Sequence, residues 1–460
     1  MSRIVDRAEL RALGRLAFPI VVIQVGLMFM GVVDTMMVGR VSAAALAAVA
    51  LGNFYYFAAV IFGMGVLLAL DPLISQAVGA QDDIAIARAV QRGFVIGLVL
   101  TVLASAVIPS AGTVLAWLHQ PADVVPLTHT YVLGTIPGVA PFFFFIVIRQ
   151  TLQAMHQTRA IVLTIIVANL VNVAINWILI FGNLGAPAMG VLGAAIATSI
   201  SRWVMFFAIA LMSWPLLRKY IRPWHPETWA VRPLLHMIRI GAPIGGAHFL
   251  EYATFGTIAL LMGLLGTTEV AGHQIAINLA SLTFMVPAGI SAAATVLVGN
   301  AIGRADPEGA RRAAKAALLV GAGFMSLSAI VFLAVPALLA GLYTSDLGVL
   351  TIAVALLPIA GLFQVFDGLQ VVGAGVLRGA GDTRAPAIIS FLGFWLVGMP
   401  VSIYLGLYTP LRAVGLWWGF VFGLAAVACF LLLRIRHRFS RELSRLEIEE
   451  QHLPALGIAD

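Results

Sequence analysis

The stretch LISQAVGAQD, residues 73–82, decides the fold, because a copy of it returns as LVGNAIGRAD at residues 297–306. The alignment places Gly79 opposite Gly303. Two further blocks repeat at nearly the same offset of 224–225 residues, namely AFPI (17–20) with GAPI (241–244) and LQAMHQTRA (152–160) with LRGAGDTRA (377–385). Three blocks with a shared offset indicate that the chain consists of two homologous halves.

The composition places both halves in a membrane. The chain has 460 residues, of which 61% are hydrophobic and 10% charged, whereas a soluble protein carries about 25% charged residues. Apolar stretches of roughly 20 residues, the length that crosses a hydrocarbon core, recur throughout. Because lipid-exposed backbone must satisfy its own hydrogen bonds, we predict that these stretches are helices. The twelve predicted spans are 16–38, 46–70, 93–117, 131–152, 160–182, 189–212, 239–262, 271–298, 316–342, 350–374, 386–408 and 412–434.

Each half holds six predicted spans, an even number, so both halves enter the membrane from the same side. The pseudo-two-fold axis that relates them then runs along the membrane normal, a common arrangement in transporters. The predicted fold is an all-α integral membrane protein with two six-helix lobes. The expected divisions are an N-terminal lobe at 1–213, a cytoplasmic linker at 214–235, a C-terminal lobe at 236–435 and a cytoplasmic tail at 436–460.

The basic residues predict the orientation. All but three of the 27 lysines and arginines lie at the N-terminus, around the connections that follow even-numbered spans, or in the C-terminal tail; the exceptions are Arg40, Arg202 and Arg412. Cytoplasmic loops carry such an excess, so we expect both termini in the cytoplasm. This distribution explains the net charge of +7 without nucleic acid. We expect Asp71 at the membrane interface and the tail from residue 441 as a solvated or interfacial helix.

Three carboxylates interrupt apolar segments: Asp34, Glu251 and Asp367. A charge near the bilayer centre costs at least about 2.5–3.5 kcal/mol on insertion scales. In a duplicated scaffold without a transport role, these buried charges would only destabilise the protein. We therefore predict that these acids bind a cation or a proton.

Asp34 has candidate partners in the fifth and sixth spans. Asn172 and Asn176 are four residues apart and share one helix face, and Thr198 lies in the next span. A carboxylate, two amide oxygens and a hydroxyl suit a hard cation such as sodium. Protonation of Asp34 is the competing use of the cluster. The alternative role of the asparagines is to join helices by hydrogen bonds.

Glu251 and Asp367 fall in the seventh and tenth spans, and the repeat does not superpose either on Asp34. Two acids in one cavity repel each other, and a proton or a monovalent cation between them relieves the repulsion. The lobes are therefore expected to differ chemically. Candidates for lining a substrate cavity nearby are Tyr252, Gln274, Asn278, Phe363 and Gln364.

Several motifs are absent from the sequence. It contains no GxxxxGK[ST] phosphate loop and no HExxH metal motif, and no soluble stretch is long enough for a nucleotide-binding domain. We expect no cofactor and no enzymatic activity. The energy for transport then comes from an ion gradient, or transport is passive.

The two-fold repeat, the segment GVVDTMMVGR around Asp34 and the motif LRGAGDTRAPAI resemble the multidrug and toxic compound extrusion (MATE) family, in its NorM-type branch. The resemblance covers all twelve spans. It implies a bacterial inner-membrane antiporter that expels lipophilic, often cationic drugs and dyes in exchange for sodium or protons.

The resemblance also implies roles for single residues. Asp34, with Asn172, Asn176 and Thr198, matches the first-lobe cation or proton site of the family. Glu251 and Asp367 match the acidic pair of the NorM branch, which the DinF-like branch lacks. Some relatives have a tyrosine where this chain has Phe363, so a hydroxyl contact is lost while a ring face that attracts cations remains.

Partners and alternatives follow from the same features. We expect small organic cations and membrane lipids as partners, no nucleic acid, and a monomer, because each chain holds both lobes. The alternative function is a lipid-linked saccharide flippase of the wider superfamily. Such a protein is expected to have a basic central cavity, whereas Arg202 is the only clear intramembrane base here.

Overall fold

The computed structural model describes residues 7–118, 120–446 and 448, and these residues contain helices and no strand. The first half comprises α1 (Arg7–Val38), α2 (Ala43–Leu67), α3 (Leu70–Gly79), α4 (Asp83–Val107), α5 (Ala111–Trp117), α6 (Val124–Thr135), α7 (Val139–Ala154), α8 (Thr158–Phe181) and α9 (Gly190–Ile221). The second half comprises α10 (Val231–Leu265), α11 (Thr267–Gly303), α12 (Pro307–Ala334), α13 (Pro336–Gly341), α14 (Leu347–Gly379), α15 (Arg384–Phe391), α16 (Met399–Leu407) and α17 (Arg412–Phe439).

Short turns link several of these helices into longer units. These are η1 (Ile108–Ser110), η2 (Ile136–Gly138) and the π-helical η5 (Leu392–Gly398). Two others, η3 (Asn183–Gly185) and η4 (Pro226–Trp229), lie in the connections that precede α9 and α10. Among the described residues, 12 helical units are long and apolar enough to cross a membrane. The prediction of twelve spans is confirmed. Most units run past the predicted boundaries, because helices continue into the polar interface, where Arg218 and Lys219 complement the last turn of α9.

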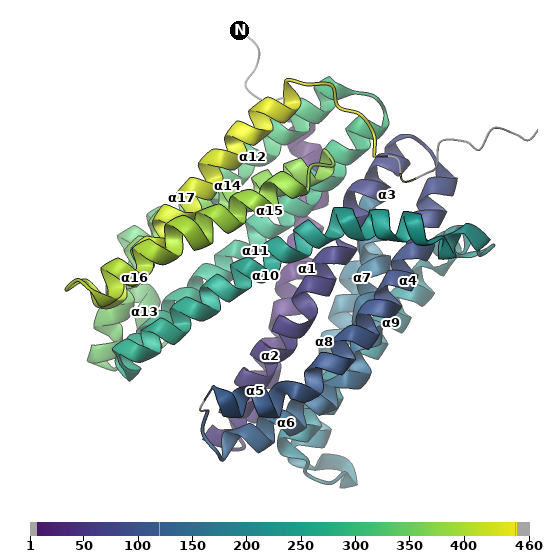
Figure 1. Ribbon diagram of the computed structural model, residues 1–460. Helices are drawn as coiled ribbons and strands as arrows, with labels where there is room; N and C mark the ends of the chain where they lie inside the picture. Colours follow the sequence, from purple (N-terminus) through teal and green to yellow (C-terminus); the bar gives the residue numbers. More distant parts are fainter. Residues whose placement is uncertain (1–6, 119, 447, 449–460) are drawn as a thin grey trace, which may run out of the picture.

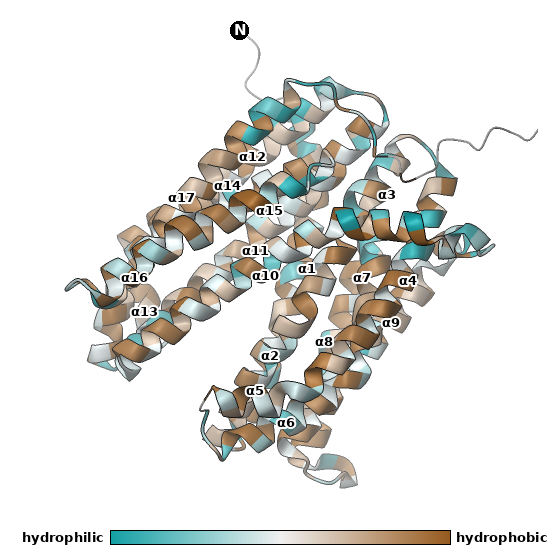
Figure 2. Cartoon of the chain, in the orientation of Figure 1, coloured by the Kyte–Doolittle hydropathy of each residue, from teal (hydrophilic) through white to brown (hydrophobic). Residues whose placement is uncertain are grey.

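The helices form two bundles that lie side by side (Figure 1). The first half, in purple and blue, makes one bundle, and the second half, in teal to yellow, makes the other. Along the helices the chain is predominantly hydrophobic, with polar residues gathered near the beginning of α10 and the loops around it (Figure 2). Large apolar side chains such as Leu211 and Leu264 are 74% exposed on the outer surface. Exposed apolar area on this scale fits a surface surrounded by lipid.

Helix α1 joins the two bundles. Leu13, Leu16 and Ile20, near its start, belong to the hydrophobic core of the second half. Ile23 and Met30, further along, belong to a core of the first half. The helix therefore carries Asp34 into the first bundle while its beginning stays packed on the second.

The two bundles meet most closely where α3 packs on α11 and α2 packs on α10. A Cβ atom added to Gly79 would lie 2.2 Å from the carbonyl oxygen of Asn300, and one added to Gly303 would lie 2.0 Å from that of Gln76. Only glycine permits backbones to approach this closely. The repeated block LISQAVGAQD and its copy thus pack on each other at the bundle interface.

The connection and the tail differ in detail from the sequence prediction. Helix α9 continues to Ile221, so the segment without α-helix between the bundles is only 222–230. The tail is not helical at residues 442–446. Instead, Arg445 pairs with Asp82 at 2.7 Å and the backbone N–H of Leu446 donates to Gln76 Oε1 at 2.6 Å. The tail residues after 448 lie outside the described part of the chain.

Candidate functional site

Asp34 lies inside the first bundle, where the residue is 2% exposed and both of its carboxylate oxygens accept hydrogen bonds. Asn172 and Asn176 donate their amide N–H groups to Oδ1 at 3.1 and 2.5 Å. The hydroxyl of Thr198 donates to Oδ2 at 2.8 Å. These four residues come from α1, α8 and α9, and the structure brings together the whole cluster that the sequence predicted. Three donors on one carboxylate stabilise its charge away from water.

The helix geometry explains which asparagines take part. Asn172 and Asn176 are one turn apart on α8, and Asn176 also donates to Asn172 Oδ1 at 3.2 Å. Asn169 lies on the same helix but donates instead to the backbone oxygens of Gly26 and Ile165. It therefore joins α8 to α1 without contacting Asp34. Asn169 fits the helix-joining alternative, whereas the other two asparagines contact the acid.

The cluster provides oxygen atoms that suit either coupling ion. Oδ1 of Asn176 is buried and has no hydrogen-bond partner. Together with the Asp34 carboxylate and the Thr198 hydroxyl, it gives the oxygen-rich set that sodium prefers. Within this set the carboxylate is the group that can take up a proton.

A partly buried cation completes the surroundings of Asp34. The guanidinium of Arg202, one turn beyond Thr198 on α9, lies 4.1 Å from the ring centroid of Tyr56. Its charge interacts with that of Asp34. A cation near an aromatic face and an acid is stabilised by both. The sequence marked Arg202 only as an isolated intramembrane base and gave no sign of this contact.

Glu251 on α10 and Asp367 on α14 form the acidic pair of the second bundle, where their charges interact. Asp367 is 5% exposed, and its Oδ1 atom is buried without a hydrogen-bond partner. Gln370, one turn further along α14, has a buried and equally unpartnered Oε1. These unsatisfied oxygens mark a place where a cation or a proton would be stabilised. Sequence reasoning missed Gln370, although its spacing of three residues from Asp367 places both on one helix face.

The proposed cavity residues lie in different surroundings. Tyr252 stacks on Phe54 at 5.1 Å between centroids, which places it where α10 meets α2. Gln274 donates to Asn278 at 3.3 Å on an exposed face of α11. Phe363 is 1% exposed and packs against Trp417.

Gln364 is fully buried and satisfied. Its amide donates to Thr283 Oγ1 at 2.8 Å, and its oxygen accepts from Ser328 at 2.7 Å. Among the five candidates, Tyr252 is the one whose contacts cross between the two bundles.

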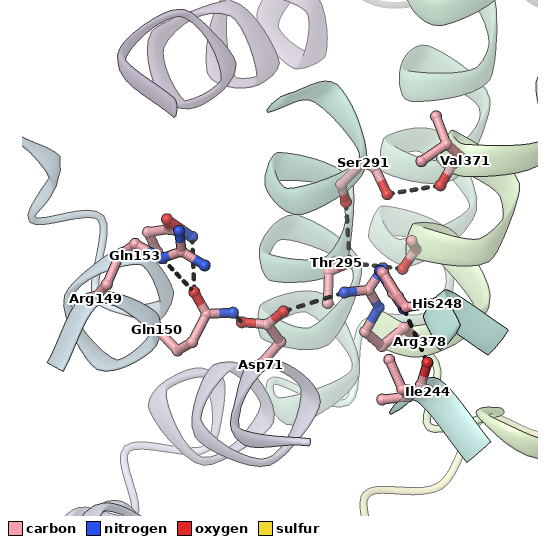
Figure 3. A network of polar contacts seen from close by, with 11 residues as sticks. Asp71, Arg149, Gln150, Gln153, Ile244, His248, Ser291, Thr295, Val371 and Arg378 are labelled. Atoms are coloured by element: carbon pink, nitrogen blue, oxygen red, sulfur yellow. Dashed lines mark hydrogen bonds and ion pairs between the residues drawn. The ribbon is translucent and has the colours of Figure 1, made fainter. Parts of the chain in front are cut away.

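Asp71, which the sequence predicted to be an interfacial residue, is buried where the two bundles meet. It is 2% exposed and accepts a hydrogen bond from Gln150. Its Oδ2 lies 3.5 Å from Nη1 of Arg378, which comes from α14 of the other bundle (Figure 3). The sequence did not reveal this pair, because 307 residues separate Asp71 from Arg378.

The comparisons with known proteins agree with this fold. The sequence matches the MatE family over residues 19–178 and again over 243–404, once in each half. It is 36% identical to the multidrug resistance protein MdtK of Edwardsiella ictaluri over 440 residues, which cover 93% of this chain and 95% of the relative. It is 37% identical to the probable multidrug resistance protein NorM of Mesorhizobium japonicum, with 93% and 94% covered.

Solved structures share the architecture. The eukaryotic MATE transporter AtDTX14 superposes with a TM-score of 0.87 at 23% identity, covering 94% of this chain and 98% of that one. The bent form of the Vibrio cholerae MATE transporter VcmN gives a TM-score of 0.82 at 21% identity, covering 94% and 97%. At this identity the likeness concerns the fold, whereas the sequence matches settle the family. The chain belongs to the MatE family, the multidrug and toxic compound extrusion proteins, and to its NorM-type branch.

Proposed function

We propose that this protein exports lipophilic, often cationic drugs and dyes in exchange for sodium ions or protons. The observation that carries the proposal is the Asp34 carboxylate, buried in a membrane helix with three donors from two other helices. An isolated charge inside a membrane helix is energetically unfavourable. Reversible binding of a cation or a proton neutralises the carboxylate and reduces this unfavourable energy. Relatives in two bacterial genera are named as multidrug resistance proteins.

The protein is a multi-pass protein of the bacterial inner membrane, as its twelve apolar helices and bacterial relatives imply. We propose that both termini lie in the cytoplasm, because lysine and arginine concentrate on that side. In this orientation the end of the molecule with α3 and the beginning of α10 faces the cytoplasm. The lobes are proposed to span 1–213 and 236–435.

We propose that each lobe has one acidic site that binds a cation or a proton. Asp34, Asn172, Asn176 and Thr198 bind the coupling sodium ion or proton in the first lobe. Glu251 and Asp367 bind a cation or a proton in the second, and Asp367 Oδ1 is free of protein partners to do so. A drug cation that competes with the coupling ion for the same acids gives obligatory exchange, because the occupancy of one lowers the affinity for the other.

Transport is proposed to proceed by alternating access, in which one lobe rocks against the other. The repeat supports this mechanism, since two similar bundles around an axis along the membrane normal can exchange equivalent packings. Such a movement would separate the candidate cavity residue Tyr252 from Phe54, on which it stacks where α10 meets α2. A monomer is sufficient, and no cofactor, catalytic step or nucleic acid takes part in this mechanism.

The test is dye efflux from liposomes that contain the purified protein. Sodium and pH gradients are imposed independently, and the loss of a cationic dye such as ethidium is followed. We expect at least one gradient to drive efflux, and the gradient that does so identifies the coupling ion. If neither gradient drives efflux of any cationic dye, the proposal fails. Movement of a lipid-linked saccharide in the same liposomes would favour the flippase instead.

A further inference from the structure

The closed contact between the two bundles contains one buried ion pair. Asp71 on α3 and Arg378 on α14 have side chains that are 3% and 11% exposed, and 3.5 Å separates Oδ2 from Nη1. Gln150 on α7 donates to the other oxygen of Asp71 and thereby orients the carboxylate toward Arg378 (Figure 3). His248, drawn nearby, has its Nδ1 2.9 Å from the carbonyl oxygen of Ile244 on its own helix. The acid therefore comes from one lobe and the base from the other.

The two halves of the chain are related by the repeat, but the ion pair has no counterpart at the position that the repeat relates to it. By the offset of 224–225 residues, Asp71 corresponds to Thr295 and Gln150 to Gly375. The equivalent residues are also hydrogen-bonded to each other, since the hydroxyl of Thr295 donates to the carbonyl oxygen of Gly375 at 2.8 Å. The charge is not kept, because Arg378 corresponds to the neutral Gln153. Opposite charges thus stand at only one of two symmetry-related places.

The surroundings show why these charges matter to movement. Beside Asp71, the glycines of α3 and α11 bring the backbones of the two lobes into contact. No path for a drug remains through such a contact, so this end must part when the transporter opens here. Burial of an ion pair costs nearly as much hydration energy as the attraction returns. A pair of this kind specifies one closed arrangement, and hydration of both charges on opening compensates for its loss.

We propose that Asp71 and Arg378 are positioning residues that hold the two lobes closed at this end and separate once in each transport cycle. The separation of the pair in each cycle rests on the proposed function, but the contact itself can be tested without transport. Loss of Asp71 leaves Arg378 buried without its acid, and loss of Arg378 leaves Asp71 with only the charge of Arg149 from its own lobe. Both changes are unfavourable for the closed contact. The closed state then becomes less populated, and the interface admits water more often.

The test uses a cysteine as a reporter of water access. Ser75 is fully buried, lies one turn after Asp71, and its Oγ would be 2.0 Å from a Cβ on Gly299 of the other lobe. In a Cys429→Ser background, Ser75→Cys reacts with a water-soluble maleimide only when the lobes part. The rate is measured on purified protein in lipid nanodiscs, without dye and without a gradient.

We expect Asp71→Asn and Arg378→Gln each to raise the labelling rate at least about tenfold. The exchange Asp71→Arg with Arg378→Asp, and the conservative Arg378→Lys, restore slow labelling. The matched control is Arg434→Gln, because Arg434 pairs with Asp382 at 2.7 Å within the second lobe alone. This control leaves the rate unchanged.

Unchanged labelling in both single variants would overturn the inference. So would labelling of Arg378→Lys as fast as that of Arg378→Gln, because the charge would then be irrelevant. Melting temperatures identify variants that are simply unfolded, and Arg378→Lys keeps the test decisive if the exchanged pair does not fold. Failure of dye efflux with the expected labelling pattern would refute the proposed transport and leave the ion-pair contact standing.

Discussion

Gln76 and Asn300 occupy equivalent positions in the two repeats, and each hydrogen-bonds across the boundary between the lobes. Nε2 of Gln76 donates to the carbonyl oxygen of Gly379 at 2.9 Å. Nδ2 of Asn300 lies 2.7 Å from Nε2 of His156, which follows α7. The same two-fold relationship therefore organises the polar contacts and the glycine contacts at this interface, and each contact suggests a measurement.

The contact between Asn300 and His156 predicts a pH dependence. Burial lowers the pKa of His156 below its ordinary value of 6.5, and the charge of Arg304 lowers it further. A neutral imidazole accepts the amide N–H, whereas a protonated one does not. The unfolded chain binds the proton more readily, so this contribution to stability is fully present above pH 6.5 and is lost as the pH falls below it.

The matched variant for this prediction is His156→Asn, which does not titrate and which tolerates the positive φ of 60° at this position. We expect the melting temperature of the wild type to fall more steeply than that of the variant on acidification below pH 6.5. Parallel curves for the two proteins would show that His156 does not contribute the dependence.

Replacement of Asp34 tests the first-lobe site. Asp34→Asn keeps the shape of the side chain but removes its charge, so we expect gradient-driven dye efflux to fall at least about tenfold with normal expression. Asn176→Ala is expected to act in the same direction, because it removes a 2.5 Å donor to the carboxylate. Asn169→Ala is the control, since its bonds go to Gly26 and Ile165. Wild-type efflux by Asp34→Asn would move coupling to Glu251 and Asp367.

The glycine contact predicts a steric effect. A methyl group at Gly79 or Gly303 would overlap a backbone oxygen of the other lobe, which destabilises the closed arrangement by about 1–3 kcal/mol. We expect Gly79→Ala and Gly303→Ala to label faster at Ser75→Cys and to transport more slowly. Gly323→Ala on α12 is the control, because a Cβ there meets no atom within 4 Å. Equal labelling of all three variants would contradict the close contact.

The tail contact predicts a local effect with little cost in stability. Burial opposes ionisation of Asp82, but the backbone N–H of Ala85 and the Arg445 guanidinium outweigh it and hold the pKa of Asp82 below its ordinary value of 3.8. The contact is therefore complete above that pH and is lost as the pH falls through the depressed pKa.

Arg445→Gln should lower stability by about 1 kcal/mol or less, because the ion pair is partly open to solvent. It should nevertheless speed tryptic cleavage after Arg441, because the tail loses its ion pair with Asp82 at the start of α4. Arg436→Gln on α17 leaves the Asp82 contact intact and should cleave at the wild-type rate. Identical cleavage of both variants would argue that the ion pair does not hold the tail.

Much of the architecture could be predicted because it depends on local and periodic features of the sequence. Apolar length determines where a chain crosses a bilayer, so the twelve spans followed from composition. The asparagine spacing on α8 placed Asn172 and Asn176 on one face, and the structure brings both to Asp34. The helix ends were less accurate, because hydropathy marks the lipid boundary and not the last hydrogen bond of a helix.

The contacts between the lobes could only be found in the tertiary structure. Asp71 and Arg378 are separated by 307 residues, and their pairing depends on how two bundles pack. Contacts within one lobe, such as Arg202 on Tyr56 and Gln364 between Ser328 and Thr283, likewise depend on how distant helices pack. The sequence alone determined the membrane class, the two-fold repeat and the acids that a bilayer makes costly, because these follow from residue type and spacing. The tertiary structure decided which acid is shared between the lobes and which stays within one, because burial and charge pairing depend on neighbours brought together by folding.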